Sequence, residues 1–499
     1  MICRELKLTM PARKWSMPLF KHQKDAVDFI FKNGGIGALY HEIGCGKTRT
    51  AIAAFERLRE MNPDLKMIVV CPLSLIESAW GADIRKFSKL KYINLREDIE
   101  VTAGFDILIC NYEFLISSKR QSMILNLLGR YRWLCVVDES SKMKNNTTVI
   151  TKTLLKLRNK FQYRIVMSGT PAPNSEMEYW GQMTFLKDRI FHPNFYAFRN
   201  IYFHMERRGQ MIPGQVVSRL DRYEMFKKGW KYGLSDTNRK NLIARISPHC
   251  HFAKKKDCLD LPDQIDQLRV VVMGPEQARA YMKMKRDAVT EIVDEYRRVS
   301  YIVARIALSK IIKLRQITSG FAIDEHGHVS GLKENPKLVE LQDILDEAGD
   351  SQIIIWCNFH REIRDITNIL GDRCCLLYGE MSTEDREKSI LDFQEGRKQY
   401  LVANPASAGH GLTFVNCSLQ IFYSLDFSYE KYEQARGRIH RIGQKNNCVY
   451  IHLLCKDSID VKILEVLQKK KNINQFIEDF LRDNEGIGVN AGDFKEDTT

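Results

Sequence analysis

The sequence contains no long hydrophobic run and no apolar segment at its N-terminus. No stretch approaches the roughly 20 apolar residues that a membrane-spanning helix needs. The opening segment MICRELKLTMPARKW also lacks the apolar core of a secretory signal peptide. We therefore expect a soluble, cytoplasmic protein with no membrane partner.

Cysteine is present, but in no metal-binding pattern. The thirteen cysteines include no C-x-x-C pair, and the His/Cys cluster at 249–258 has no standard zinc spacing. Several other cysteines lie in predicted buried strands, where a reduced thiol packs as a small hydrophobe: Cys71, Cys110, Cys135 and Cys357. This usage indicates a reducing compartment and argues against a secreted protein.

Acidic residues are in the minority. The 499 residues carry 76 Lys and Arg against 62 Asp and Glu, a net charge of +14, and they suggest about three domains. The stretch 221–256 has ten basic residues against three acidic ones, so half of the excess lies in 36 residues. We expect this stretch, and in particular Lys254, Lys255 and Lys256, to contact a polyanion such as DNA.

A phosphate-binding loop is predicted at 41–48, where the sequence reads HEIGCGKT. It departs from the GxxxxGK[ST] pattern because His41 stands where the first glycine would be. A predicted strand at 36–40 precedes the loop and an amphipathic helix at 48–58 follows it. Main-chain N–H groups and side chains of the loop would bind the phosphates of a nucleotide, and the candidate ligands are Gly44, Cys45, Gly46, Lys47 and Thr48.

Two carboxylates follow another predicted strand, at 134–137. Asp138 and Glu139 come directly after this apolar run. Carboxylates at the carboxyl end of a parallel strand lie where open α/β sheets bind ligands. We expect Asp138, with the hydroxyl of Thr48, to hold Mg²⁺, and Glu139 to orient and deprotonate the attacking water. A further strand at 165–167 leads into the loop 168–171, a candidate for reporting the nucleotide state.

Near the other end of the chain, residues 434–444 read QARGRIHRIGQ. Arg438 and Arg441 are predicted on neighbouring turns of a helix, where two guanidinium groups could converge on a polyphosphate. The phosphate-binding loop lies about 390 residues earlier in the sequence. The pair of motifs predicts a nucleotide held between two lobes, with arginine fingers supplied by the second lobe. This arrangement is typical of an ATP-driven motor.

Predicted strands divide the chain into two α/β halves around a mostly helical middle. Further strands are expected in the first half at 67–71 and 107–110, and in the second half at 353–357, 375–378, 400–403, 419–423 and 450–454. We predict an α/β fold whose regions are a first lobe at 1–186, a helical and basic insertion at 187–330, a second lobe at 331–483 and a disordered tail at 484–499.

These residues resemble the superfamily 2 helicases and, within them, the SWI/SNF-type DNA translocases. The resemblance runs from about residue 19 to 469, and eight motifs occur in that family's order. They are FKHQ (20–23), HEIGCGKT (41–48), VVCPLSLIESAW (69–80), DESSKMKN (138–145), SGTPAPN (168–174), IIIWCNFHREI (353–363), ANPASAGHGLTF (403–414) and QARGRIHRIGQ (434–444).

The resemblance implies two RecA-like parallel-sheet lobes that close on ATP, with helical protrusions inserted between them. It assigns Gln23 to the adenine ring and Gly411 to the nucleotide site. It assigns three residues of the second lobe to the γ-phosphate: Gln434, Arg438 and Arg441. DNA contacts are implied near Ser74, Asn358 and Ser407.

The chain departs from the family pattern at His41, where an acidic residue is usual, and at 140–141 and 405–406. The DES start of one motif and the GLTF end of another resemble the branch that contains fork-remodelling annealing helicases. Only about 18 residues precede the first motif. We therefore expect a stripped-down bacterial or phage member with no chromatin-reading domain and no nucleosome-sliding role.

The expected protein is an ATP- and Mg²⁺-dependent DNA translocase or helicase. It would act as a monomer on duplex or branched DNA in replication, recombination or repair, in a bacterial or infected-host cytoplasm, with replication or recombination proteins as candidate partners. Three alternatives remain open: an RNA helicase, the motor of a restriction-type system, and an ATP-gated DNA clamp or loader that does not track. The intact Glu139, Arg438 and Arg441 argue against the last.

Overall fold

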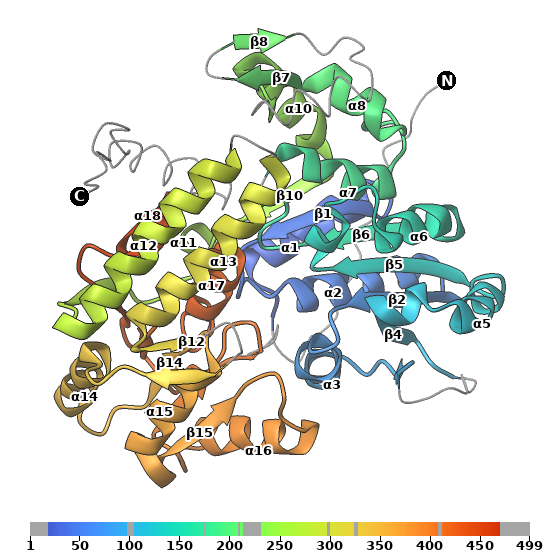
Figure 1. Ribbon diagram of the computed structural model, residues 1–499. Coiled ribbons are helices and arrows are strands. Elements are labelled where there is room, and N and C mark those ends of the chain that lie inside the picture. Colours follow the sequence, from blue (N-terminus) through green and yellow to red (C-terminus); the bar gives the residue numbers. More distant parts are fainter. Residues whose placement is uncertain are drawn as a thin grey trace, which may run out of the picture. The chain divides into compact units, whose positions relative to one another are not determined.

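A computed structural model of the protein describes residues 18–96, 104–173, 175–207, 210–212, 231–296, 300–323, 328–407 and 412–469. The chain forms two compact units (Figure 1). Unit 1 comprises Met1–Pro171, Glu178–Pro193 and Ala244–Asp260, and unit 2 comprises Ala172–Met177, Asn194–Ile243 and Leu261–Thr499. The predicted tail at 484–499 and residues 221–230 of the basic stretch lie outside the described residues.

Unit 1 is built on a seven-stranded parallel sheet. The strand order is β10 (Cys250–Ala253), β1 (Ile36–His41), β6 (Tyr163–Met167), β5 (Arg132–Asp138), β2 (Leu65–Cys71), β4 (Ile107–Asn111) and β3 (Tyr92–Asn94). The inner strands are continuous apolar runs because helices cover both faces of a parallel sheet. The four cysteines predicted to pack in strands are buried, and those in this unit are Cys71, Cys110 and Cys135.

Helices precede, connect and follow the strands of unit 1. They are α1 (Lys21–Lys32), α2 (Lys47–Met61), the π-helix η1 (Ile76–Gly81), α3 (Ala82–Phe87), α4 (Tyr112–Ile116), α5 (Ser118–Leu128), α6 (Val149–Leu157) and α7 (Tyr179–Leu186). A core of apolar side chains from α1, α2 and η1 packs against alternate residues of β1, β2, β5 and β6, among them Leu39, Val69, Val136 and Met167. The carboxyl ends of β1, β6 and β5 therefore lie at one edge of a rigid sheet.

Unit 2 has its own parallel sheet of six strands. The order is β11 (Gln264–Val271), β18 (Cys448–Cys455), β17 (Leu419–Phe422), β14 (Ile353–Trp356), β16 (Tyr400–Ala403) and β15 (Cys374–Leu377). Its helices are α14 (Pro336–Ala348), α15 (His360–Leu370), α16 (Thr383–Gln394), α17 (Tyr429–Arg436) and α18 (Ile459–Gln468). The predicted α/β fold with two parallel-sheet units is confirmed, and no described helix is long and apolar enough to cross a membrane.

The region predicted to be a helical insertion is mixed. It contains α8 (Phe195–Tyr202), α10 (Asp236–Ile246), α12 (Pro275–Tyr296) and α13 (Ser300–Thr318), together with the antiparallel strands β7 (His204–Arg207), β8 (Gln210–Ile212) and β9 (Lys231–Gly233). A two-stranded ribbon follows α13 and consists of β12 (Phe321–Ile323) and β13 (Val329–Gly331).

The prediction of helices throughout this region is wrong at two strands that belong to the main sheets. β10 pairs with β1 at the edge of the first sheet, and β11 pairs with β18 at the edge of the second. An edge strand has a neighbour on one side only, and β11 is exposed along most of its length, so neither strand has the apolar run of a central strand. Residues 244–260 consequently belong to unit 1.

Candidate nucleotide site

The phosphate-binding loop connects β1 to α2 in unit 1. Gly44 and Gly46 have φ values of 94° and 72°, which glycine adopts at no steric cost, and Gly46 is the residue that precedes α2. The Lys47 ammonium donates to the main-chain oxygen of His41 at 3.0 Å, across the loop. The loop N–H groups and the start of α2 are thus arranged as a turn that can accept an anion, with Thr48 as the second residue of the helix.

His41 occupies the first position of the loop without distorting it. It is the last residue of β1, where the backbone is extended, so this position does not need glycine. The buried imidazole Nε2 lies 2.9 Å from Nδ1 of His251 on β10. Burial, reinforced by His251 and Lys47, lowers the pKa of His41 to about 2, so the ring is neutral at physiological pH.

Gln23 lies in the first turn of α1 and contacts the phosphate-binding loop. Its side chain is buried, its Oε1 accepts from the Phe20 N–H at 3.0 Å, and its Nε2 faces the main-chain oxygens of Cys45 and Gly46 at 3.5 and 3.4 Å. A Cβ atom at position 46 would lie 2.4 Å from this Nε2, a second reason for glycine there. The structure therefore brings Gln23 to the loop as the motif implies, while its role toward adenine stays a prediction.

Asp138 ends β5 and Glu139 directly follows it, two strands away from β1 and at the same edge of the sheet. Asp138 accepts two hydrogen bonds, from the Trp80 indole N–H at 3.0 Å and from the Glu139 main-chain N–H at 2.9 Å. Burial and then the Glu139 charge raise the pKa of Asp138 to about 6, and the nearby Lys47 opposes this rise. An ammonium, a hydroxyl-bearing helix start and two carboxylates thus converge at one edge of one sheet.

Sequence reasoning missed the side chains that hold this acidic turn. Trp80, in the π-helix η1, is fully buried with its N–H on Asp138, and Tyr112 donates to the main-chain oxygens of Asp138 and Glu139 at 2.6 and 3.2 Å. Gln182 on α7 also bonds to the turn, through Ser140. Trp80 ends the motif at 69–80, for which the family resemblance implies a contact with DNA. Nothing local in the sequence links Trp80, Tyr112 or Gln182 to Asp138.

The arginine motif of unit 2 begins at the end of α17, and the predicted helix through Arg438 and Arg441 is wrong. The helix ends at Arg436, Gly437 bonds back to Glu433, and the chain continues in turns, because glycine is a poor helix former. Arg438 is buried and donates to the Leu412 oxygen at 3.2 Å, while Arg441 donates to the Gly437 oxygen at 2.6 Å and to Thr413 Oγ1 at 3.0 Å.

Both arginines therefore contact the segment that follows the predicted nucleotide residue Gly411, which itself lies outside the described residues. Gln434 is buried in the last turn of α17, and its side-chain amide donates to the Glu430 carboxylate at 3.3 Å. The structure thus brings the two arginines of this motif to the end of the ANPASAGHGLTF motif within unit 2. Their action on ATP stays a prediction.

The candidate DNA contacts lie in loops at the carboxyl ends of strands. Ser74 follows β2, and Ser407 follows β16 with its main-chain oxygen bonded by Arg386. Asn358 follows β14, but its amide nitrogen donates to the oxygen and Oγ of Ser424 at 2.8 and 3.1 Å, so it has a structural role within unit 2. DNA binding by these residues stays a prediction.

The three lysines at 254–256 come directly after β10. Lys254 and Lys256 are exposed, and the main-chain N–H of Lys255 donates to the carboxylate of Glu42 in the phosphate-binding loop at 2.9 Å. The cluster is therefore attached to the loop that would bind ATP. The sequence predicted it only as a DNA contact in the insertion region, and the pairing of β10 with β1 places its start at the same sheet edge as the loop.

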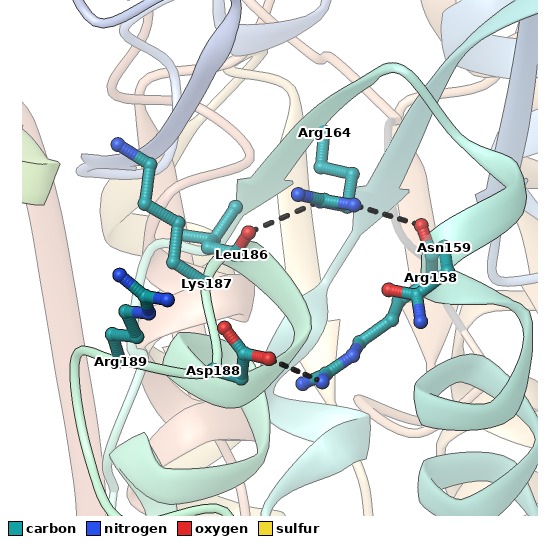
Figure 2. Close-up of a pocket in the computed structure, with 7 residues that line it drawn as sticks. All are labelled: Arg158, Asn159, Arg164, Leu186, Lys187, Asp188 and Arg189. Carbon is teal, nitrogen blue, oxygen red and sulfur yellow. Dashed lines mark hydrogen bonds and ion pairs between the residues drawn. The ribbon is translucent and has the colours of Figure 1, made fainter.

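A basic cavity of about 150 Å³ lies at the opposite edge of the unit 1 sheet, beside the start of β6 (Figure 2). Figure 2 shows two of its three arginines directed at oxygens of their own unit: Arg158 pairs with Asp188 at 3.0 Å, and Arg164 donates to the Leu186 and Arg158 oxygens at 3.0 and 2.8 Å. These guanidinium groups cap main-chain carbonyls at helix ends. We assign this cavity a structural role.

Comparison with known proteins links both units to described families. Residues 22–320 match the family model of the SNF2-related domain, and residues 336–443 match that of the helicase conserved C-terminal domain. The chain is 25% identical to protein p41 of the Acyrthosiphon pisum secondary endosymbiont phage 1, over 88% of this chain and 92% of that protein.

Larger eukaryotic proteins are also similar. Identity is 24% to the transcription regulatory protein SNF2 of Saccharomyces cerevisiae, over 89% of this chain and 26% of that protein, and 23% to the ISWI chromatin-remodeling complex ATPase CHR11 of Arabidopsis thaliana, over 90% and 41%. Among solved structures, the SWI2/SNF2 ATPase core of Sulfolobus solfataricus in complex with dsDNA is 25% identical over 96% of each chain, with a TM-score of 0.43.

Proposed function

This chain belongs to the SNF2-related family of DNA-dependent ATPases, and we propose that it uses ATP hydrolysis to move along or remodel duplex or branched DNA. The observation that carries the proposal is the convergence of Lys47, Thr48, Asp138 and Glu139 at one edge of the unit 1 sheet. Such an edge is where parallel α/β sheets bind their ligands.

In unit 1, the loop 44–48 would bind the ATP phosphates and Gln23 the adenine ring. Thr48 and Asp138 fit Mg²⁺, which takes oxygen ligands and needs only one or two of them from the protein when phosphates supply others. Bound there, Mg²⁺ would supply positive charge that stabilises the negative charge of the phosphates. The two hydrogen bonds on Asp138 leave lone pairs of both carboxylate oxygens for this role.

Glu139 is the proposed general base. Its main chain is held by Asp138 and Tyr112, so the carboxylate is presented from a fixed turn. Its task would be to orient the attacking water and accept its proton. Arg438 and Arg441, with Gln434, are proposed to stabilise the charge on the γ-phosphate, which makes hydrolysis depend on both units.

We further propose that the protein serves DNA replication, recombination or repair as a monomer in a bacterial or infected-host cytoplasm. The similarity to a phage protein, which covers 88% of this chain and 92% of that protein, supports this setting. Lys254–Lys256, Ser74 and Ser407 are the proposed DNA contacts, with replication or recombination proteins as candidate partners. An RNA helicase, the motor of a restriction-type system and a non-tracking clamp or loader are the alternatives to be tested.

The test compares ATP hydrolysis with single-stranded DNA, duplex DNA, forked DNA and RNA offered separately. We expect duplex or forked DNA to stimulate hydrolysis most. Displacement of a third strand from a DNA triplex would then measure tracking. Stimulation by RNA alone would support the RNA helicase, and DNA-stimulated hydrolysis without triplex displacement would support the clamp or loader.

A further inference from the structure

Gln182 is a fully buried polar residue on α7 to which neither the sequence motifs nor the proposed mechanism gives a role. Its Oε1 accepts two hydroxyl groups, Tyr40 OH at 3.0 Å and Ser140 Oγ at 2.7 Å. Its Nε2 donates to two main-chain oxygens, those of Pro171 at 2.7 Å and Glu178 at 3.2 Å. Both ends of the amide are therefore used to their full capacity.

The partners of Gln182 come from three parts of the nucleotide site. Tyr40 is the residue before His41, at the end of β1 where the phosphate-binding loop begins. Ser140 directly follows Glu139, the proposed general base. Pro171 ends the loop that follows β6, and β6 lies between β1 and β5 in the sheet. One side chain thus joins the starts of both catalytic segments to this third loop.

Pro171 is also one of the points at which the chain leaves unit 1, to which it returns at Glu178. Residues up to Pro171 belong to unit 1, and Ala172–Met177 belong to unit 2. Segments where a chain passes between units are where hinge motions are absorbed. The Gln182 amide nitrogen therefore holds the last unit 1 residue before such a crossing, while its oxygen holds the turn that carries Glu139.

The orientation of this amide is determined by its partners. Two carbonyl oxygens can only accept hydrogen bonds, so they require the NH₂ end, and the two hydroxyls then donate to the oxygen. If Pro171 moved, Nε2 would lose its acceptor within a buried site, where an unpaired polar group is unfavourable. A displacement of the chain at Pro171 would thus alter the positions of Ser140 and of the adjacent Glu139.

We propose that Gln182 is a positioning residue that couples the crossing at Pro171 to the turn bearing Glu139. A movement of the chain at Pro171 shifts the side-chain amide of Gln182. This shift displaces Ser140 and with it the turn that carries the general base, Glu139. The inference rests on the proposed function, because it concerns how DNA-driven motion would control the hydrolysis step.

The test uses two variants and one control. Gln182→Met keeps the volume and helix preference but removes all four bonds, and Tyr40→Phe/Ser140→Ala/Gln182→Met also removes the hydroxyls that Gln182→Met leaves unpaired. The control is Gln162→Met, an exposed glutamine whose amide bonds only to Tyr163 OH, at 3.1 Å, among the described residues. For each protein the unfolding temperature is measured, together with kcat and KM for ATP with and without saturating duplex DNA.

We expect Gln182→Met to lower the unfolding temperature and to lower DNA-stimulated kcat by about tenfold or more, since small misplacements of catalytic groups are costly. KM for ATP should stay within about twofold, because the phosphate contacts are untouched. The triple variant should regain the unfolding temperature but not the stimulation by DNA.

Two outcomes would overturn the coupling role. DNA stimulation at the wild-type level in Gln182→Met would do so, and so would recovery of both stability and stimulation in the triple variant, which would mean that Gln182 only packs. If Gln182→Met does not fold, the triple variant decides alone by the same criterion. Absence of DNA stimulation in the wild-type protein would instead reject the proposed function.

Discussion

At the scale of single residues, Glu139 combines a proposed catalytic role with an unusual backbone. Its φ of 50° lies in the left-handed region, which among the described non-glycine residues only Asp457 shares. Such a conformation costs on the order of 1 kcal/mol or more and persists only where the surroundings impose it. Here the Tyr112 hydroxyl and the Asp138 carboxylate hold the turn, so the strain is stored at the proposed general base.

We predict that Glu139→Gln binds ATP normally but loses turnover. The amide is isosteric and leaves the phosphate-binding loop unchanged, but it cannot accept the proton of the attacking water. General-base catalysis contributes roughly 10²- to 10⁴-fold, so steady-state hydrolysis should fall by that range. Wild-type turnover in this variant, with the exposed Glu60→Gln as control, would remove Glu139 from the mechanism.

The lowered pKa of His41 predicts how the stability of the protein depends on pH. The pKa of His41 is lowered to about 2 in the folded protein, so the unfolded chain takes up a proton below pH 6.5 while the folded chain does not. His41 thus contributes stability that is present above pH 6.5 and is lost as the pH falls, by about 3 kcal/mol at pH 4. In urea unfolding, His41→Gln should lose less stability between pH 7 and pH 4 than wild type or the exposed His360→Gln. Equal losses in all three would contradict this account.

At the scale of elements, a buried ion pair joins four pieces of unit 2. Lys337 at the start of α14 is fully buried with its ammonium 2.6 Å from Asp460 on α18, which also accepts from Thr318 at the end of α13 and from the Cys455 N–H of β18. Burial is the largest single influence and by itself would lower the pKa of Lys337, but Asp460 together with Cys455 and Glu362 outweighs it, so the pKa is raised.

Removal of one partner should therefore be costly. We predict that Lys337→Met destabilises unit 2 by about 3–5 kcal/mol, because it leaves an unpaired buried carboxylate. Lys337→Met/Asp460→Asn should recover part of this loss, since the amide keeps hydrogen bonds without the charge. Thermal unfolding of both variants measures the difference, and a double variant no more stable than the single one would contradict the explanation.

The position of the lysines after β10 leads to a prediction about DNA binding and its salt dependence. The strand is followed directly by Lys254 and, two residues later, Lys256, both exposed and next to the nucleotide loop. Lys254→Gln/Lys256→Gln should weaken DNA binding and make its salt dependence shallower by about 0.9 for each phosphate of duplex DNA that is no longer neutralised. Lys152→Gln/Lys156→Gln on α6 removes two other exposed lysines as a control. An unchanged slope would mean that the cluster is only a solvated surface.

At the scale of the whole molecule, the proposal requires that unit 2 acts on ATP bound by unit 1. We predict that Arg441→Lys largely abolishes DNA-stimulated hydrolysis, by about 10³- to 10⁵-fold as for other arginine fingers, and leaves DNA binding near normal. Lysine lacks the planar fork that bonds to two oxygens. The control is the exposed Arg397→Lys. Normal hydrolysis with weakened DNA binding would identify this motif as a DNA-binding element instead.

The sequence by itself determined the proposed catalytic segments and the central strands. The phosphate-binding loop, the acidic pair after β5 and the ten predicted strands were found because each is a local pattern: an apolar run, glycines that permit a tight turn, or carboxylates at a strand end. These patterns also sufficed to predict two parallel sheets in one chain, and membership of the SNF2-related family agrees with the motifs that suggested it.

Only the tertiary structure decided which distant residues meet. β10 became part of the first sheet by pairing with β1, about 210 residues away, and this moved the lysine cluster to the nucleotide loop. The hydrogen bonds of Trp80 and Gln182 likewise depend on partners remote in sequence. The turn that replaces the helix at Arg438 depends on a single glycine, Gly437. An edge strand or a buried hydrogen bond is specified by what lies across from it, so neither leaves a periodic signal in the sequence.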